Sequence, residues 1–283
     1  MIERLGVMVR SQKVIVFCSV ILALFLLITI FAPWIAPHDP NLVNVTAKLQ
    51  GSSLAYPLGT DHLGRCTLSR ILYGARTSLG FATLIFISSL SIGLIIGLIA
   101  GYKGGWVDQA LMRFADGVMA FPDLLLVLGL VGIWGAGLRQ VLIALIFVQW
   151  VYYARIIRGV VLSLKEQSYI TAAKISGSSQ WKIIMKHIIP NVLPPLAIMA
   201  TLEMGWAIMH LSSMSFLGLG VQPPIPEWGA MIHEGKSYIR TNPLLMVYPG
   251  LMIMLVVVTF NLLGETLSER FGLNTDNKEG RVK

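Results

Sequence analysis

Long apolar runs with few charged residues recur along this chain of 283 residues. A helix needs about 20 residues to cross a bilayer core of about 30 Å. Six runs are of roughly that length, and they occupy residues 14–35, 77–102, 117–138, 141–161, 192–214 and 241–264. Backbone polar groups inside lipid must be hydrogen-bonded within their own segment, so each run is expected to be helical. The pattern predicts an all-α, polytopic membrane protein with six transmembrane helices.

The first run has a competing interpretation as a signal peptide, because small residues occur near its end at Ala32 and Ala36. The apolar region of a signal peptide is about 7–15 residues long, and this run is clearly longer. We therefore interpret it as the first membrane span.

The expected organisation follows from the order of runs and polar segments. It comprises a cytoplasmic N-terminus at 1–13, a first span at 14–36, an external loop at 37–77, a five-helix core at 78–267 with a polar insertion at 164–191, and a cytoplasmic tail at 268–283. With the N-terminus inside, 15 of the 22 lysines and arginines fall on the cytoplasmic side. Basic residues are enriched in cytoplasmic loops, which favours placing both termini in the cytoplasm.

Composition supports a membrane protein and argues against other classes. Charged residues make up 13% of the chain, against about 25% in soluble domains. The net charge of +8 is spread over basic residues that apolar spans separate, with no basic face interleaved with aromatic residues, so we expect membrane lipid as a partner and no nucleic acid. Cys18 and Cys66 lack the spacing of a disulfide framework or a zinc site and are interpreted as structural thiols.

The polar insertion between the fourth and fifth runs has the pattern of a helical hairpin. Good helix formers occupy 168–176, Gly177 interrupts them, and a second short helix is expected over 178–189. In this second helix Trp181, Ile184, Met185 and Ile188 follow the spacing of one amphipathic face; they are separated by 3, 1 and 3 residues. Such a helix can lie on the membrane surface or fit a groove in a partner protein.

Three segments carry a resemblance to a known family. The run Tyr169-Ile-Thr-Ala-Ala-Lys-Ile-Ser-Gly177, with His187-Ile-Ile-Pro190 after nine further residues, resembles the E-A-A-x₃-G-x₉-I-x-L-P coupling loop of ABC importer permeases. Thr171 stands where that motif has glutamate, and His187 stands where it often has isoleucine. The small residues and the turn glycine of the motif are retained.

The other two segments narrow the resemblance to one branch. Pro57-Leu-Gly-Thr-Asp-His-Leu-Gly-Arg65, with Ser69-Arg70 and Gly74-Ala-Arg76 behind it, is similar to the external loop of the dipeptide, oligopeptide and nickel permeases, although Cys66 replaces their usual aspartate. The segments 215–220 and 226–231 are similar to the region after their fifth helix. With all three in the family's order, the chain resembles the C-type membrane subunit of such an importer.

The resemblance implies a type I ABC importer permease in a bacterial or archaeal plasma membrane. Its implied partners are a second permease, two ATP-binding subunits and an extracytoplasmic substrate-binding protein. ATP with Mg²⁺ would be used by the ATP-binding subunits and no cofactor by this chain, which has no G-x-x-x-x-G-K-[ST] motif. The positions implied in coupling to the ATPase are Thr171, Ala172, Ala173, Gly177, Trp181 and Pro190.

The external loop has four charged residues within the motif region, namely Asp61, Arg65, Arg70 and Arg76. They can pair with one another and stiffen the loop, and we favour a solvated, self-paired loop over direct substrate contact because exposed ion pairs are common and weak. The resemblance implies that this loop helps to seat the substrate-binding protein.

The fifth run has a lane of polar and sulfur-containing side chains. Met199, Glu203, Trp206, His210 and Met214 follow at spacings of 4, 3, 4 and 4, which places them on one helical face. Acids and histidines inside a membrane usually face a bundle interior or a water-filled path. The lane is predicted to line the translocation path; the alternative is bonding to neighbouring helices with ordinary methionine packing. Contact with a metal such as nickel is possible chemically, with no firm metal site.

Two other functional classes receive little support. The five histidines form no H-E-x-x-H motif and no G-x-S-x-G accompanies them, which argues against an intramembrane enzyme. An ion channel would need a filter-like loop that the sequence lacks. For the substrate, the runs 150–155 and 210–216 resemble nickel-type members, while peptide-type members share the remaining motifs. Nickel or metal chelates and short peptides therefore both remain candidates.

Overall fold

The computed structural model describes residues 2–270, and side chains from residue 12 onward. The regular elements of this part are helices: α1 (Ile2–Ile35), η1 (Val45–Ala47), α2 (Thr67–Lys103), α3 (Gly105–Met119), α4 (Asp123–Trp134), α5 (Leu138–Lys165), α6 (Ser168–Ile175), α7 (Gln180–Ile183), the π-helical turn η2 (Ile184–Ile188), α8 (Ile189–Phe216), α9 (Trp228–Gly235), η3 (Lys236–Tyr238) and α10 (Leu244–Arg270). The all-α class is confirmed. Most of the predicted tail, residues 271–283, lies outside the described part.

Five stretches of helix are long and apolar enough to cross a membrane. They are α1 from Gln12, α2, α5, the continuous stretch Gln180–Phe216 and α10. A sixth span is available only as a broken one, because α3 and α4 meet at an angle of 88°.

The prediction of one continuous third helix over 117–138 is therefore wrong. The chain leaves the helix at Ala120, and Pro122 precedes the first residue of α4. Proline disfavours helical backbone in the residue before it and has no N–H to donate, which accounts for a break at this position.

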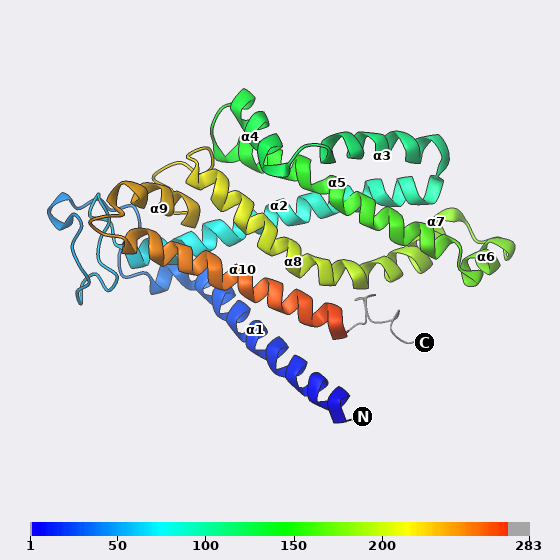
Figure 1. Cartoon of the computed structure of the whole chain (residues 1–283), viewed down its shortest axis with the longest axis horizontal. Helices are drawn as coiled ribbons and strands as arrows, with labels where there is room; N and C mark the ends of the chain where they lie inside the picture. Colours follow the sequence, from blue (N-terminus) through cyan, green and yellow to red (C-terminus); the bar gives the residue numbers. More distant parts are fainter. Residues whose placement is uncertain (1, 271–283) are drawn as a thin grey trace.

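The helices form an elongated bundle with distinct ends (Figure 1). The beginning of α1, the last turn of α10 and the α6–α7 hairpin lie toward one end. The segment between α1 and α2 and the short helix α9 lie at the other end. The polar segments predicted to be cytoplasmic and those predicted to be external are thus separated along the long axis of the bundle.

The predicted external loop at 37–77 ends earlier than expected. Helix α2 begins at Thr67 and is 37 residues long, well beyond what a span requires. Its first turns extend past the apolar run and include Arg70, whose side chain is buried. The sequence did not reveal this extension, because the charged residues at 70 and 76 are as typical of a polar loop as of the amphipathic end of a helix.

The small residues of α2 pack against α5, as their four-residue spacing suggests. A Cβ atom on Gly97 would lie 2.7 Å from the Ala154 carbonyl oxygen, and one on Gly101 would lie 2.8 Å from Val161 Cβ. Gly93 approaches Tyr153 and the Trp150 carbonyl equally closely. These glycines allow the two helices at the centre of the bundle to approach each other closely.

Gly97→Leu is expected to destabilise the protein by about 1–3 kcal/mol, because overpacking here pushes against the α5 backbone. A lower midpoint of thermal unfolding in detergent would show the effect. Gly80→Leu is the matched control, since Gly80 lies on the same helix and a Cβ added to it would have no neighbouring atom within 4 Å. Equal midpoints for the two variants would contradict close packing at Gly97.

Candidate functional site

The hairpin at one end of the bundle is closed by a glycine in left-handed conformation. Helix α6 ends at Ile175, and Gly177 has φ +75°. Its N–H donates to the Lys174 carbonyl (3.0 Å) and the Ser178 N–H donates to the Ala173 carbonyl (3.1 Å). This pair of bonds is a Schellman motif, which requires the left-handed residue and so favours glycine. The predicted helix and turn are confirmed.

The second half of the hairpin differs from the prediction of a separate short helix. Helix α7 continues through η2 directly into α8, so the span that begins at Gln180 has no interruption before Phe216. The π-helical turn closes with the Ile189 N–H donating to the Ile184 carbonyl, five residues back. The second helix is thus the start of the fifth span.

This turn also changes which face is buried. Ile183 and Ile188, five residues apart, are both buried, whereas Trp181 is 68% exposed and Met185 is 41% exposed. The expected face therefore holds only in part, because Ile188 is buried and Ile184 half-buried, whereas Trp181 and Met185 are exposed. The expected face assumed a regular 3.6-residue period, and a π turn displaces that period by one residue.

The hairpin presents apolar side chains to its surroundings. Ile175 is 83% exposed, and Tyr169 is 43% exposed. The positions implied in coupling lie on or beside this surface: Thr171, Ala172, Gly177, Trp181 and Pro190 are exposed, and Ala173 is half-buried. We call Tyr169, Ile175, Trp181 and Met185 the hairpin patch. Several large apolar side chains left exposed on one short hairpin are what an interaction surface would supply.

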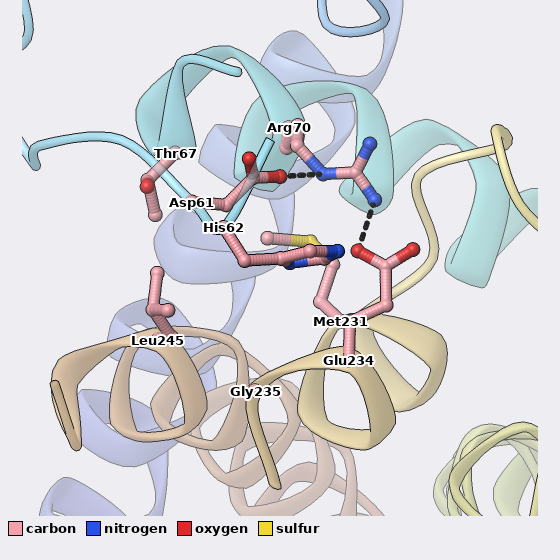
Figure 2. Close-up of a pocket in the computed structure, with 8 residues that line it drawn as sticks. All are labelled: Asp61, His62, Thr67, Arg70, Met231, Glu234, Gly235 and Leu245. Atoms are coloured by element: carbon pink, nitrogen blue, oxygen red, sulfur yellow. Dashed lines mark hydrogen bonds and ion pairs between the residues drawn. The ribbon is translucent and has the colours of Figure 1, made fainter. Parts of the chain in front are cut away.

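At the opposite end, buried charges join the segment before α2 to α9 (Figure 2). Arg65 Nε lies 2.6 Å from Asp61 Oδ2, and Arg65 Nη2 lies 2.6 Å from Glu234 Oε2. Arg70 Nη2 approaches the same Glu234 oxygen at 3.0 Å, and its Nε lies 3.6 Å from Asp61. We call these four residues the charge cluster.

The expectation of a solvated, self-paired loop is only partly right. Asp61, Arg65 and Arg70 do associate, but the arginine side chains are just 2% and 1% exposed. Arg76 is exposed on α2 and takes part in no ion pair within the described residues. Sequence reasoning missed Glu234, which lies 169 positions from Arg65; only the neighbouring 226–231 motif pointed to its region.

Helix α9 is anchored beside the cluster by a second buried acid. Glu227 is fully buried and accepts hydrogen bonds from the Ser78 hydroxyl (3.0 Å) and the Ala230 N–H (2.9 Å). Trp228 donates from Nε1 to the Ile71 carbonyl at 3.1 Å. These bonds fix α9 to α2 and make this end a rigid, hydrogen-bonded platform.

His62, Asp61 and Glu234 place one potential metal-ligating atom each within 4.8 Å of one another. The acidic oxygens that would bind a cation already face two guanidinium groups. Because arginine cannot lose its charge in proteins, an additional cation would be repelled. The arrangement is therefore an ion-pair network.

Part of the polar lane borders a cavity of about 250 Å³ that is partly open to the surroundings of the chain, since Asp123 and Tyr152 on its wall are exposed. Its walls include Met119, Asp123, Gln149, Tyr152, Glu203 and Trp206, contributed by α3, α4, α5 and α8. Gln149 Nε2 donates to Glu203 Oε2 at 2.8 Å. The structure thus brings Glu203 and Trp206 of the lane to a cavity, together with an acid from the broken third span.

The rest of the lane does not reach this cavity. His210 stacks on Trp206, with ring centroids 3.8 Å apart, and does not itself line the wall. Met199 is half-buried and lies outside the cavity wall. Met214 is fully buried within the hydrophobic core, which corrects its assignment to a translocation path. Helical spacing placed these residues on one face but could not show what each part of that face contacts.

Comparison with known proteins agrees with these features. Residues 93–272 match the family described as binding-protein-dependent transport system inner membrane component. The chain belongs to this family. Residues 8–52 also match the N-terminal transmembrane domain of oligopeptide transport permease C. The chain is therefore a multi-span permease of the inner membrane, part of an ABC importer with ATPase and substrate-binding components, and not an enzyme.

Curated relatives cover almost the whole permease. It is 41% identical over 250 residues to the nickel transport system permease protein NikC of Escherichia coli (strain K12), covering 88% of this chain and 90% of the relative. It is 40% identical over 260 residues to the dipeptide transport system permease protein DppC of Alkalihalophilus pseudofirmus, covering 92% and 86%. Both predicted substrate classes thus occur among its relatives.

A solved structure confirms the fold. The permease aligns with a chain of the inward-facing MetNI methionine ABC transporter with a TM-score of 0.59, over 72% of its own length and 96% of that chain. Sequence identity is 18%, so this likeness concerns the architecture alone.

Proposed function

We propose that this permease forms a translocation path together with a second, different permease and imports short peptides or nickel complexes. One of two ATP-binding subunits docks on the α6–α7 hairpin of this chain, and an extracytoplasmic binding protein delivers substrate at the α9 end. The observation that carries this proposal is the hairpin patch, an exposed apolar surface held by a Schellman turn at one end of the bundle.

Both termini lie in the cytoplasm under this proposal. The described start of α1 and the end of α10 lie toward the hairpin end (Figure 1), and the hairpin is where the ATPase must bind. The excess of lysine and arginine in the same segments supports the orientation. ATP and Mg²⁺ act in the partner subunits, and this chain binds no cofactor of its own.

The side chains of the hairpin would fit a groove of the ATP-binding subunit whose walls are apolar and acidic. Lys174, Lys182 and Lys186 are exposed beside the hairpin patch. Thr171 replaces the glutamate of the family's motif, so the hairpin itself offers no acidic side chain there. Packing of small and apolar groups, assisted by complementary charge, would then hold the ATPase.

Ile175→Asp is expected to lower the recovery of ATPase subunits that co-purify with the permease by at least tenfold. The substitution places a charge at the most exposed residue of the hairpin patch, where docking would bury it. Ile225→Asp is the matched control, since Ile225 is 43% exposed and lies in the segment just before α9, at the opposite end of the molecule (Figure 1). Undiminished recovery with Ile175→Asp would exclude the hairpin patch from the interface.

The platform at the other end is the proposed seat of the binding protein. Its arginines are turned inward to Asp61 and Glu234, so the charge cluster supports the platform and does not itself present positive charge. Arg76 is the exposed member of the predicted set. We propose that the binding protein contacts the outer surface beside the charge cluster. This surface includes His62 and Tyr238, whose stacked rings have centroids 5.5 Å apart.

A further inference from the structure

We propose that the cavity bounded by Asp123 and Glu203 binds a positively charged organic group, an ammonium such as the free amino terminus of a short peptide. This inference rests on the proposed function, because it assumes that the cavity belongs to the path along which substrate moves. The inference adds to the proposed function the chemical class of substrate that the path accepts.

The wall of the cavity is rich in acceptors. Asp123 and Glu203 each contribute a carboxylate, and the described lining residues include no lysine, arginine or histidine. The nearest arginine along α5, Arg155, is paired with Asp116 on α3. Gln149 donates a hydrogen bond to Glu203, but no basic side chain on the described wall balances the two negative charges, and a bound cation would.

An independent observation points to a ligand. Gln149 lines the cavity and is 3% exposed, and its Oε1 has no hydrogen-bond partner within the described part of the chain. Its Nε2 is already used, donating to Glu203 and to the Tyr153 hydroxyl at 3.2 Å. Buried acceptors are almost always satisfied in folded proteins. This acceptor remains unsatisfied within the described chain, on a residue of the cavity wall.

The aromatic walls decide between kinds of cation. Tyr152 and Trp206 border the cavity, and aromatic faces attract organic ammonium groups, with tryptophan the strongest. A late divalent metal would prefer imidazole or thiolate ligands. His210 stacks on Trp206 and does not line the cavity, and both cysteines lie elsewhere. The donor set therefore fits an ammonium better than a bare nickel ion.

The broken third span is what completes the site. Asp123 is the first residue of α4, immediately after the break at 120–122. In one continuous helix, as the composition suggested, Asp123 would lie on a straight continuation of α3. The 88° bend instead brings it to the same cavity as Glu203.

The test uses the complete transporter, with this permease carrying Met119→Cys on the cavity wall. Cationic and anionic methanethiosulfonate reagents are compared by their rates of reaction with the new thiol. The two native cysteines are buried, so the unsubstituted chain provides the background. The cationic reagent is expected to react at least about tenfold faster, and Glu203→Gln or Asp123→Asn to remove most of that preference.

Glu265→Gln is the matched control, because Glu265 is an exposed acid on α10 and outside the cavity. It is expected to leave the rate ratio unchanged. A ratio near one in the parent, or equal loss in all three acid variants, would overturn the proposal. The ratio does not require ATPase docking, so its failure is separable from failure of the Ile175→Asp experiment.

Protection of the thiol identifies the ligand class. Alanyl-alanine is expected to slow labelling, and N-acetyl-alanyl-alanine, which lacks the ammonium, to leave it unchanged. Equal protection by the two peptides, or none by either, would refute an ammonium site. Protection by Ni²⁺ alone would replace the ammonium with a metal ion as the ligand.

Discussion

Gly177→Val is expected to abolish ATP-driven uptake while leaving membrane insertion intact. At φ +75° a β-branched residue is strongly disfavoured, and the Schellman bonds from residues 177 and 178 would be lost with the turn. Helix α6 would then leave its position beside α7 and disrupt the hairpin patch. Uptake of labelled substrate and substrate-stimulated ATP hydrolysis measure the loss, which we expect to exceed tenfold.

Two variants control for this effect. Gly177→Asn is expected to retain much of the activity, because asparagine tolerates the left-handed conformation better than other side chains. Gly159→Val replaces an exposed glycine of α5 with no atom within 4 Å of a new Cβ and with ordinary helical backbone. Normal uptake by Gly177→Val would refute a role for the turn in coupling.

Glu234→Gln is expected to destabilise the permease by about 3 kcal/mol, the cost of breaking a buried ion pair from one side. Glu234 faces both Arg65 and Arg70, which are nearly inaccessible to water. Removing its charge leaves two buried guanidinium groups with Asp61 alone. The thermal midpoint in detergent should fall by several degrees.

Arg76→Gln provides the comparison on the same helix as Arg70. Arg76 is exposed, so its substitution should change stability by no more than about 0.5 kcal/mol. If Glu234→Gln were as stable as Arg76→Gln, the charge cluster would not be what holds the segment before α2 against α9.

The helical character of the chain was predictable because hydrophobic length is a local property. A span needs only enough consecutive apolar residues, and five of the six expected runs coincide with helices that meet this requirement. The turn at Gly177 was predictable for the same reason, since a glycine between two helical patterns marks a left-handed end. The coupling motif likewise occupies one contiguous segment.

Features that depend on packing were not accessible in this way. The π turn at Ile184–Ile188 lies between Ile183 and Ile188, which are both buried although they are five residues apart, whereas Trp181 is exposed. The common face of Met199, Glu203, His210 and Met214 was inferred from spacing, but different parts of it contact different neighbours.

By itself, the sequence determined an all-helical membrane protein with a coupling hairpin and membership in a permease family. Only the tertiary structure decided that Glu234 completes the charge cluster and that Asp123 and Glu203 share a cavity. Membrane insertion and turn formation depend on neighbours within about one helical span. Ion pairs and cavities depend on residues as far as 169 positions apart, whose meeting is set by helix packing and by the break at Pro122.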